Sequence, residues 1–349
     1  MKNHFKLLNL FTLFFICYIF GQEPKILFQS DSVLKLTIKL HTYETIRDVE
    51  DRAYHNAILS YTDEKNVESI HQVKLKVRGN NRANINTCNF PPLEVNFKKG
   101  KSKNTLFEGQ NKLKLVTHCK NTSVFSDYIN EEYMIYKMYQ LITPISYNVR
   151  LCEITYIDLD GEKKPLTQTG FLMERTKHLA ARNNMVVYKD SIAHQDVCNK
   201  TELDKLTVFQ FMIGNLDWSV PMRHNIKILA PEKRGFPVAV PYDFDHSGIV
   251  NTAYANPPEG SGITSVRSRV FRGLCRFNNG YDKTFDLYQE LKPEFFALAQ
   301  NSSYLSDKSK KSVEKYLESF YDILDNPKKV DQKIVTACRA KHKHFYDTK

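Results

Sequence analysis

Three oxygen-bearing side chains stand at defined points of the second half of the chain. Asp217 follows an apolar stretch in GNLDWSV, Asn225 opens NIKIL, and Asp243 ends the run PVAVPYD. Carboxylate and amide oxygens are the ligands that Mg²⁺ prefers, and Mg²⁺ usually binds through one or two carboxylates together with substrate phosphates. The order Asp, Asn, Asp, interrupted by a strand-like segment, therefore predicts a metal–phosphate site.

Phosphoryl transfer gives each of these residues a role. It needs a positioned phosphate, a metal that neutralises charge, and a carboxylate near the acceptor hydroxyl. We expect Asp217 to be the catalytic base, Asn225 and Asp243 to be metal ligands, and Asp245 to be a second metal ligand or a helix N-cap. His224 is expected to be structural, because neighbouring strand residues point to opposite faces. A single Asp beside Gly or Pro also fits an ordinary turn, so the prediction rests on the combination.

The first half of the chain offers cations for the phosphates. The turn in VRGNNR supplies Arg78 and Arg82 together with backbone N–H groups, which suit phosphate oxygens. The segment KLKLV places two lysines on one side of a strand, and Lys114 is the one that we expect at the α- and β-phosphates. Glu132 in the following helical segment is expected to orient this lysine, with Glu131 as the fallback. Solvated surface charge is the alternative for each of these side chains.

The pattern of apolar residues predicts the elements that position these groups. SVLKLTIKL, HQVKLKVRG, PPLEVNF and NKLKLVTHC alternate apolar and polar residues, which is typical of half-buried strands. A helical period follows over 126–143, and then a hairpin with strands at 149–158 and 169–175. Helices are expected from residue 176 onward, including 201–215 and the tail 280–349.

This order predicts an α+β protein of two lobes. The N-lobe, residues 22–175, would be an antiparallel sheet with one embedded helix. The C-lobe, residues 176–349, would be mainly helical and carry the metal and catalytic loops. That layout is the one of a two-lobed kinase, which holds a nucleotide between its lobes.

The N-terminus and the bulk composition predict an exported protein. The basic MKNHFK, the largely apolar LLNLFTLFFICYIF and the short GQEPK have the order of a secretory signal peptide over residues 1–21, and no later stretch is long and apolar enough for a membrane span. We therefore expect a periplasmic or secreted protein with no stable membrane span after cleavage. Removal of Cys17 leaves an even number of cysteines, which permits disulfides, and Cys88–Cys119 is the favoured pair.

The net charge of +11 in 349 residues fits a polyanionic partner, a membrane surface or a nucleotide. The lysines are spread along the chain and no nucleic-acid-binding motif is present, so nucleic acid is not expected as a partner. One denser basic stretch, SVRSRVFRGLCR at 265–276, would engage an acidic substrate or a phosphate, or else form structural salt bridges.

Several motifs together resemble the CotH kinase-like family, a group of atypical protein kinases. The resemblance runs from VRGNNR and NKLKLV through EEYMIYKMY and GFLMER to FQFMIGNLDWS, HN and VPYDFDHSG, over roughly residues 70–250. It implies an atypical protein kinase-like fold and ATP- and Mg²⁺-dependent phosphorylation of protein Ser or Thr, with Mg²⁺ replaceable by Mn²⁺. It implies Asp217 as the catalytic Asp, with Asn225 and Asp243 as metal ligands. The family often carries lysines where this chain has Glu94 and Asn96.

Two other functions remain open at this point. One is a catalytically inactive protein of the same fold that binds a nucleotide, a phosphate or a partner protein at the cell surface or in the periplasm. The other is a metal-dependent phosphoesterase, for which the His-rich or multi-Asp set of a two-metal centre is missing from the sequence. Neither the protein substrate nor catalytic turnover is specified by the residues.

Overall fold

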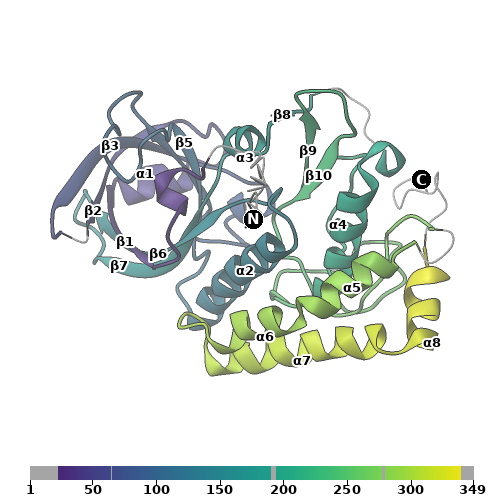
Figure 1. Cartoon of the computed structure of the whole chain (residues 1–349). Coiled ribbons are helices and arrows are strands. Elements are labelled where there is room, and N and C mark those ends of the chain that lie inside the picture. Colours follow the sequence, from purple (N-terminus) through teal and green to yellow (C-terminus); the bar gives the residue numbers. More distant parts are fainter. Residues whose placement is uncertain (1–22, 64, 190–193, 277–279, 339–349) are drawn as a thin grey trace, which may run out of the picture.

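Seven strands form a closed β-barrel at one end of the molecule (Figure 1). The computed structural model describes residues 23–63, 65–189, 194–276 and 280–338. The barrel strands are β1 (Leu34–Leu40), β2 (His55–Thr62), β3 (Glu68–Val77), β4 (Leu93–Phe97), β5 (Lys112–Val116), β6 (Val149–Asp158) and β7 (Leu166–Met173). Their order around the barrel is β1-β2-β3-β4-β5-β7-β6.

The alternation in the sequence explains how these strands enclose a core. In β1, Leu34, Leu36, Ile38 and Leu40 are buried, whereas the residues between them are exposed or half-buried. Successive side chains of a strand point to opposite faces, so the inward set of every strand contributes to one interior. The aliphatic and aromatic residues of that interior form a hydrophobic cluster of their own.

The predicted two-lobed atypical kinase-like fold with an antiparallel-sheet N-lobe was wrong. The structure is of the α+β class, but β1 pairs in parallel with β6, from Leu34 opposite Cys152 to Leu40 opposite Asp158. This pairing closes the sheet into a barrel in which the remaining pairs are antiparallel. The alternation of apolar and polar residues indicates which face of a strand is buried, but it does not indicate which strands pair. The pairing of β1 with β6 was therefore not predicted.

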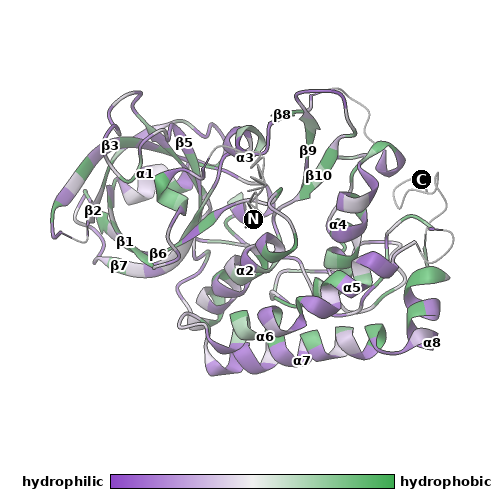
Figure 2. Ribbon diagram, viewed as in Figure 1, coloured by the Kyte–Doolittle hydropathy of each residue, from purple (hydrophilic) through white to green (hydrophobic). Residues whose placement is uncertain are grey.

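Helices occupy the other end of the molecule, and α2 (Ser123–Ile142) lies between them and the barrel (Figure 1). Of the others, α1 (Thr42–Arg47) lies at the barrel, where it contacts β3 (Figure 1). The remaining helices are α3 (Thr176–Arg182), α4 (Lys200–Ile213), α5 (Asp282–Glu290), α6 (Lys292–Gln300), α7 (Asp307–Leu324) and α8 (Pro327–Val330). Short 3₁₀ turns lie at Ile26–Phe28, Asn81–Ala83 and Gln195–Val197, and a π turn at Asp331–Val335. Helix α7 carries hydrophobic and hydrophilic residues in alternation along its length, as expected of a helix with one face in the core (Figure 2).

A small three-stranded sheet extends from the helical part. It contains β8 (Met185–Val187), β9 (Ile226–Pro231) and β10 (Val238–Pro241), with β9 in the middle. Helix α4 packs against β10 of this sheet. Its N-cap is Asn199, and its C-cap is Gly214 in a left-handed conformation, φ 65°. A Cβ at Gly214 would clash with the Tyr316 hydroxyl, so glycine is required there.

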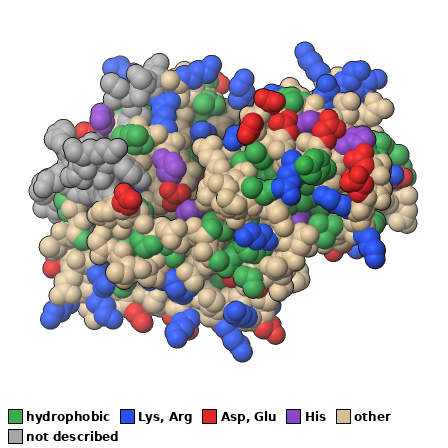
Figure 3. Space-filling view, turned by 180° about the vertical axis from the view of Figure 1, so that it is seen from behind, with side chains coloured by type: hydrophobic (Ala, Val, Ile, Leu, Met, Phe, Trp, Pro, Cys, Tyr) green, Lys and Arg blue, Asp and Glu red, His purple; other side chains and the backbone are tan. Residues whose placement is uncertain are grey.

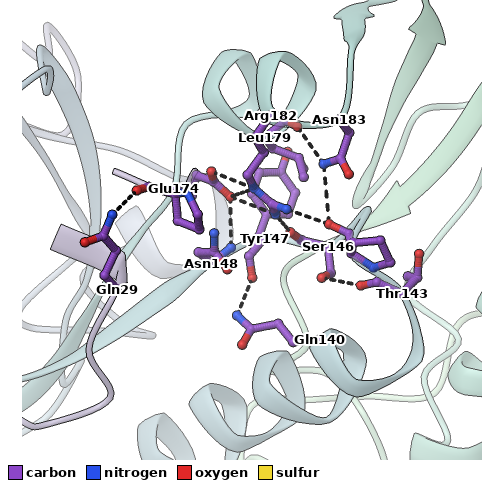
Figure 4. Close-up of polar contacts among 12 residues, drawn as sticks. Gln29, Gln140, Thr143, Ser146, Tyr147, Asn148, Glu174, Leu179, Arg182 and Asn183 are labelled. Carbon is purple, nitrogen blue, oxygen red and sulfur yellow. Dashed lines mark hydrogen bonds and ion pairs between the residues drawn. The ribbon is translucent and has the colours of Figure 1, made fainter. Parts of the chain in front are cut away.

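A buried ion pair fixes the junction between the barrel and the helical part (Figure 4). Glu174, just after β7, accepts hydrogen bonds from Arg182 Nε at 3.1 Å and from the Asn148 N–H at 3.0 Å. Arg182 also donates to the carbonyl oxygens of Pro144, at 2.7 Å, and of Ser146. Because these partners come from the α2–β6 loop, β7 and α3, the barrel and α2 are held in one relative position.

Disulfides close two loops. The predicted Cys88–Cys119 bond is present, and Cys275–Cys338 joins the segment before α5 to the C-terminal turn. Cys152 and Cys198 are buried free thiols. The predicted signal peptide, residues 1–21, lies outside the described residues, and the division at residue 175 stays a prediction. Among the residues described, no helix has both the length and the apolar character needed to cross a membrane.

Candidate functional site

Asp217 lies in the loop that follows α4, and each of its carboxylate oxygens has a hydrogen-bond partner. The Asp217 N–H donates to Asn215 Oδ1 at 2.9 Å, which fixes the backbone. Its Oδ1 lies 2.6 Å from His224 Nε2, and its Oδ2 accepts from Asn225 Nδ2 at 2.9 Å. Burial alone raises the pKa of the Asp217 carboxyl, but the hydrogen bond and charge of His224 outweigh it, and the pKa lies below its usual value. Asp217 is therefore held as an oriented carboxylate.

The contact of His224 with Asp217 was missed from the sequence, where His224 was interpreted as structural and pointing away. The backbone of Ser219 and His224 forms an isolated β-bridge with N–H···O distances of 2.9 and 3.0 Å. The tight turn that this bridge closes brings the half-exposed imidazole back onto Asp217. The assumption of a regular strand failed because β9 begins only at Ile226 and Asn225 has a left-handed backbone, φ 50°.

Asn225 and Asp243 leave the same end of the β9–β10 hairpin. The Tyr242 N–H donates to the Asn225 carbonyl at 3.0 Å, and the Asp243 N–H donates to the Tyr136 hydroxyl of α2 at 2.9 Å. Asn225 uses its amide nitrogen on Asp217, and its amide oxygen has no hydrogen bond among the described residues. The Asp243 side chain is exposed at this point. The structure thus brings the three predicted residues into one region, in which Asp243 is exposed and Asn225 is buried.

Behind Asp243 lies a buried group of charged side chains. Glu132 is 1% exposed and pairs with Arg82, whose Nη1 lies 3.7 Å from Glu132 Oε2. Asp245 is also buried and accepts a hydrogen bond from the Tyr254 hydroxyl at 3.0 Å. Burial raises the pKa of both carboxyl groups, and the charge of Asp245 raises that of Glu132 further. Two buried acids and the nearby Asp243 thus share one arginine, which is an environment that favours an additional cation.

Glu132 does not orient Lys114 as the sequence had suggested. Within the described residues its ion pair is with Arg82, and none joins Lys114 to Glu132 or to Glu131. Glu131 is buried against α7, where it hydrogen-bonds to Ser309, and burial raises its pKa to about 8. Residues adjacent on a helix point about 100° apart, so the two glutamates serve different neighbours.

Lys114 lies instead over the ring of Tyr242, with Nζ 4.6 Å from the ring centroid. Lys227 of β9 approaches the same ring, at 5.1 Å, and was not identified from the sequence, although its polar place within NIKIL marks an outward residue. Burial lowers the pKa of Lys114 to about 7, the charges of Arg78 and Lys227 lower it, and Asp243 opposes them. We call Arg78, Lys114 and Lys227 the cation cluster.

Other basic residues are engaged elsewhere. Glu94 pairs with Lys76 and Lys112, at 3.8 and 3.7 Å, on the outer face of the barrel. On the face of the molecule shown in Figure 3, Lys and Arg side chains are scattered among acidic and neutral ones and do not form one patch. The cation cluster is therefore distinguished by its position beside Asp243 and not by an unusual local density of charge.

Most arginines of the stretch 265–276 support the site structurally. Arg269 donates to the Met212 and Tyr316 carbonyls, at 3.1 and 2.6 Å, and Arg276 pairs with Asp204 at 2.6 Å. Arg272 is buried, donates to the Leu216 carbonyl and lies over the Trp218 ring at 5.2 Å. Arg269, Arg272 and Arg276 therefore have structural roles, which was one of the two predictions for this stretch. Arg272 contacts the loop that carries Asp217 and stabilises it.

The donor set fits Mg²⁺ only as a site completed by phosphate and water. No three His, Cys, Asp or Glu side chains in the described part of the chain are grouped so that they could hold a metal by themselves. Mg²⁺ commonly binds through one or two carboxylates and keeps several waters. The exposed Asp243 carboxylate and the free Asn225 amide oxygen meet that requirement, whereas Asp245 is turned towards Tyr254.

No protein-family model matches the chain, and no curated protein matches its sequence.

Proposed function

We propose that the protein is an exported, periplasmic or secreted phosphotransferase that moves the γ-phosphate of ATP to a protein hydroxyl with Mg²⁺ or Mn²⁺. The observation that carries the proposal is the state of Asp217. Its carboxylate is held by donors on both oxygens, in the region that also contains Asp243 and the cation cluster. Charge of both signs is thus gathered in one region, as transfer of a phosphoryl group requires.

Each part of the site has a role in that reaction. The cation cluster binds the phosphate oxygens, and Asn225 and Asp243 would hold the metal, which neutralises phosphate charge when bound. Asp217 accepts the proton of the acceptor hydroxyl as its oxygen bonds to the γ-phosphorus. The bond from that phosphorus to the β,γ-bridging oxygen breaks, and ADP leaves with the electron pair. His224 stabilises the charge of Asp217 through their hydrogen bond.

The test is incubation of the purified mature chain with γ-labelled ATP and Mg²⁺ or Mn²⁺, scored as label on the protein itself and on added proteins. Asp243→Asn should remove transfer by more than 100-fold, because it removes the only exposed carboxylate of the proposed metal site. Asp286→Asn is the matched control, since Asp286 is an exposed residue of α5 far along the chain from the site. Equal labelling in the wild type and Asp243→Asn would refute the proposal.

A nucleotide- or phosphate-binding protein without turnover is the second candidate. It is favoured by the pairing of Glu132 with Arg82, which leaves Lys114 without an orienting carboxylate among the described residues. Thermal stabilisation by Mg²⁺ with ATP but no label transfer to any protein would select this function, because a ligand of the native state stabilises it.

A further inference from the structure

A small pocket opens beside Asp217. Its volume is about 110 Å³. It is lined by Gly214, Leu216, Asp217, His246, Asn256, Pro258, Ile263 and Val266. None of the residues of the cation cluster lines it.

Four of the eight residues that line this pocket have aliphatic side chains. Leu216 is buried, and Pro258, Ile263 and Val266 are half-buried, so their apolar surface is partly available to an occupant. Apart from Asp217 and His246, no titratable side chain lines the pocket. A small uncharged aliphatic group could bury its surface against Leu216, Pro258, Ile263 and Val266, so this part of the lining suits such a group.

The chain segment that forms the pocket wall is held by hydrogen bonds near both of its ends. The Thr252 hydroxyl donates to the Asp245 carbonyl at 3.0 Å, and Tyr254 donates to the Asp245 carboxylate. At the other end, the Tyr316 hydroxyl of α7 donates to the Arg267 carbonyl at 3.0 Å. These anchors fix the apolar wall relative to Asp217, so the pocket exists before any substrate binds.

His246 ties the same region to the barrel. Its Nε2 lies 3.2 Å from Asn81 Nδ2, in the turn that follows β3, and its charge contributes to the low pKa of Asp217. The pocket therefore opens where the barrel, the Asp217 carboxylate and the aliphatic lining residues lie close together. An acceptor whose hydroxyl reaches Asp217 must place the neighbouring part of its chain close to this wall.

We propose that the pocket is a specificity site for the acceptor: it receives a small aliphatic side chain adjacent in sequence to the phosphorylated Ser or Thr. The inference rests on the proposed function and names the class of peptide used by the same site. Peptides with Ala, Val or Pro beside the hydroxyl residue should be preferred roughly tenfold in kcat/KM over those with Asp or a large aromatic residue, the discrimination that a small hydrophobic pocket provides.

The experiment uses the mature chain and peptide sets in which one position beside Ser or Thr is varied. Val266→Ala enlarges the pocket and should shift the preference towards Leu and Met, a gain that misfolding does not produce. Thr264→Phe is the control, because Thr264 is exposed in the same segment and does not line the pocket. It should leave the preference and rate of the wild type unchanged.

The outcomes separate the two proposals. Transfer to peptides with no preference at any varied position, or a preference unchanged in Val266→Ala, would overturn the specificity pocket and leave the phosphotransferase standing. Absence of transfer to every peptide and protein, with no self-labelling, would refute the phosphotransferase and the specificity pocket with it.

Discussion

The pKa of Lys114 gives the sharpest test of the cation cluster. Burial and the neighbouring Arg78 lower this pKa to about 7, so the side chain loses its charge within an accessible pH range. Phosphate binds the protonated lysine, and binding above pH 7 must therefore take up a proton. The affinity for nucleotide should fall as pH rises through the pKa of the free protein.

The magnitude follows from the protonated fraction. With a pKa of about 7, this fraction is about 0.9 at pH 6 and about 0.01 at pH 9, so the affinity should fall by roughly 100-fold, or about 2.7 kcal/mol. The free protein should show the opposite trend in stability. The unfolded chain binds more protons at Lys114 between pH 7 and its usual pKa near 10.4, so this group favours folding as pH rises.

The assay is calorimetric titration with a non-hydrolysable ATP analogue and Mg²⁺ at pH values from 6 to 9. Lys114→Arg is the matched variant, because its guanidinium keeps its charge throughout and should give a nearly flat profile. Titration of the nucleotide itself affects both proteins alike and cancels in the comparison. Parallel profiles for the wild type and Lys114→Arg would refute the assignment of Lys114 to the phosphate site.

Three further predictions concern the site and the residues that stabilise the fold. Asp217→Asn should reduce transfer by roughly 10²–10⁴-fold in the labelling assay, since it removes the proton acceptor; full activity would exclude Asp217 as the base. Replacing Cys88 and Cys119 by Ala should cost about 3.7 kcal/mol in denaturant unfolding, from the loop of sequence separation 31 that the bond closes; an unchanged midpoint would contradict the chain-entropy account. Gly214→Ala should cost about 2–4 kcal/mol through its left-handed backbone and the clash with the Tyr316 hydroxyl, and Tyr316→Phe should recover part of that loss; strictly additive effects would argue against the clash.

The barrel strands were largely predictable from the sequence, and their closure was not. The segment 149–158 was expected as a strand and is β6 with the same bounds. The parallel contact of β6 with β1 depends on the curvature of the whole sheet, which no short window encodes. Helix α1 was missed because its six residues are too few to show a helical period.

The residues that carry the oxygens of the candidate site could be predicted from the sequence, whereas its basic residues could be predicted only in part. Asp217, Asn225 and Asp243 were found because they end or begin apolar segments, and chain direction alone brings such ends together. Lys227 and His224 were missed because their positions depend on a tight turn and on the approach of the barrel to the hairpin. The partner of Glu132 is likewise set by tertiary packing, which places Arg82 and not Lys114 beside it.

The backbone of the hairpin adds an independent reason to regard these oxygens as functional. Asn225 and Asp243 both have positive φ, 50° and 66°, and Arg223 beside them has φ 50°. A left-handed conformation costs a non-glycine residue about 1–2 kcal/mol, less for Asn and Asp, and persists only where surrounding contacts determine it. Here those contacts are the Tyr242 N–H on Asn225 and the Asp243 N–H on the Tyr136 hydroxyl. A turn needed only to connect strands would be served by glycine at both positions, whereas Asn and Asp keep an oxygen at each one. Two of the non-glycine residues with positive φ are therefore those whose side chains the proposed metal site requires.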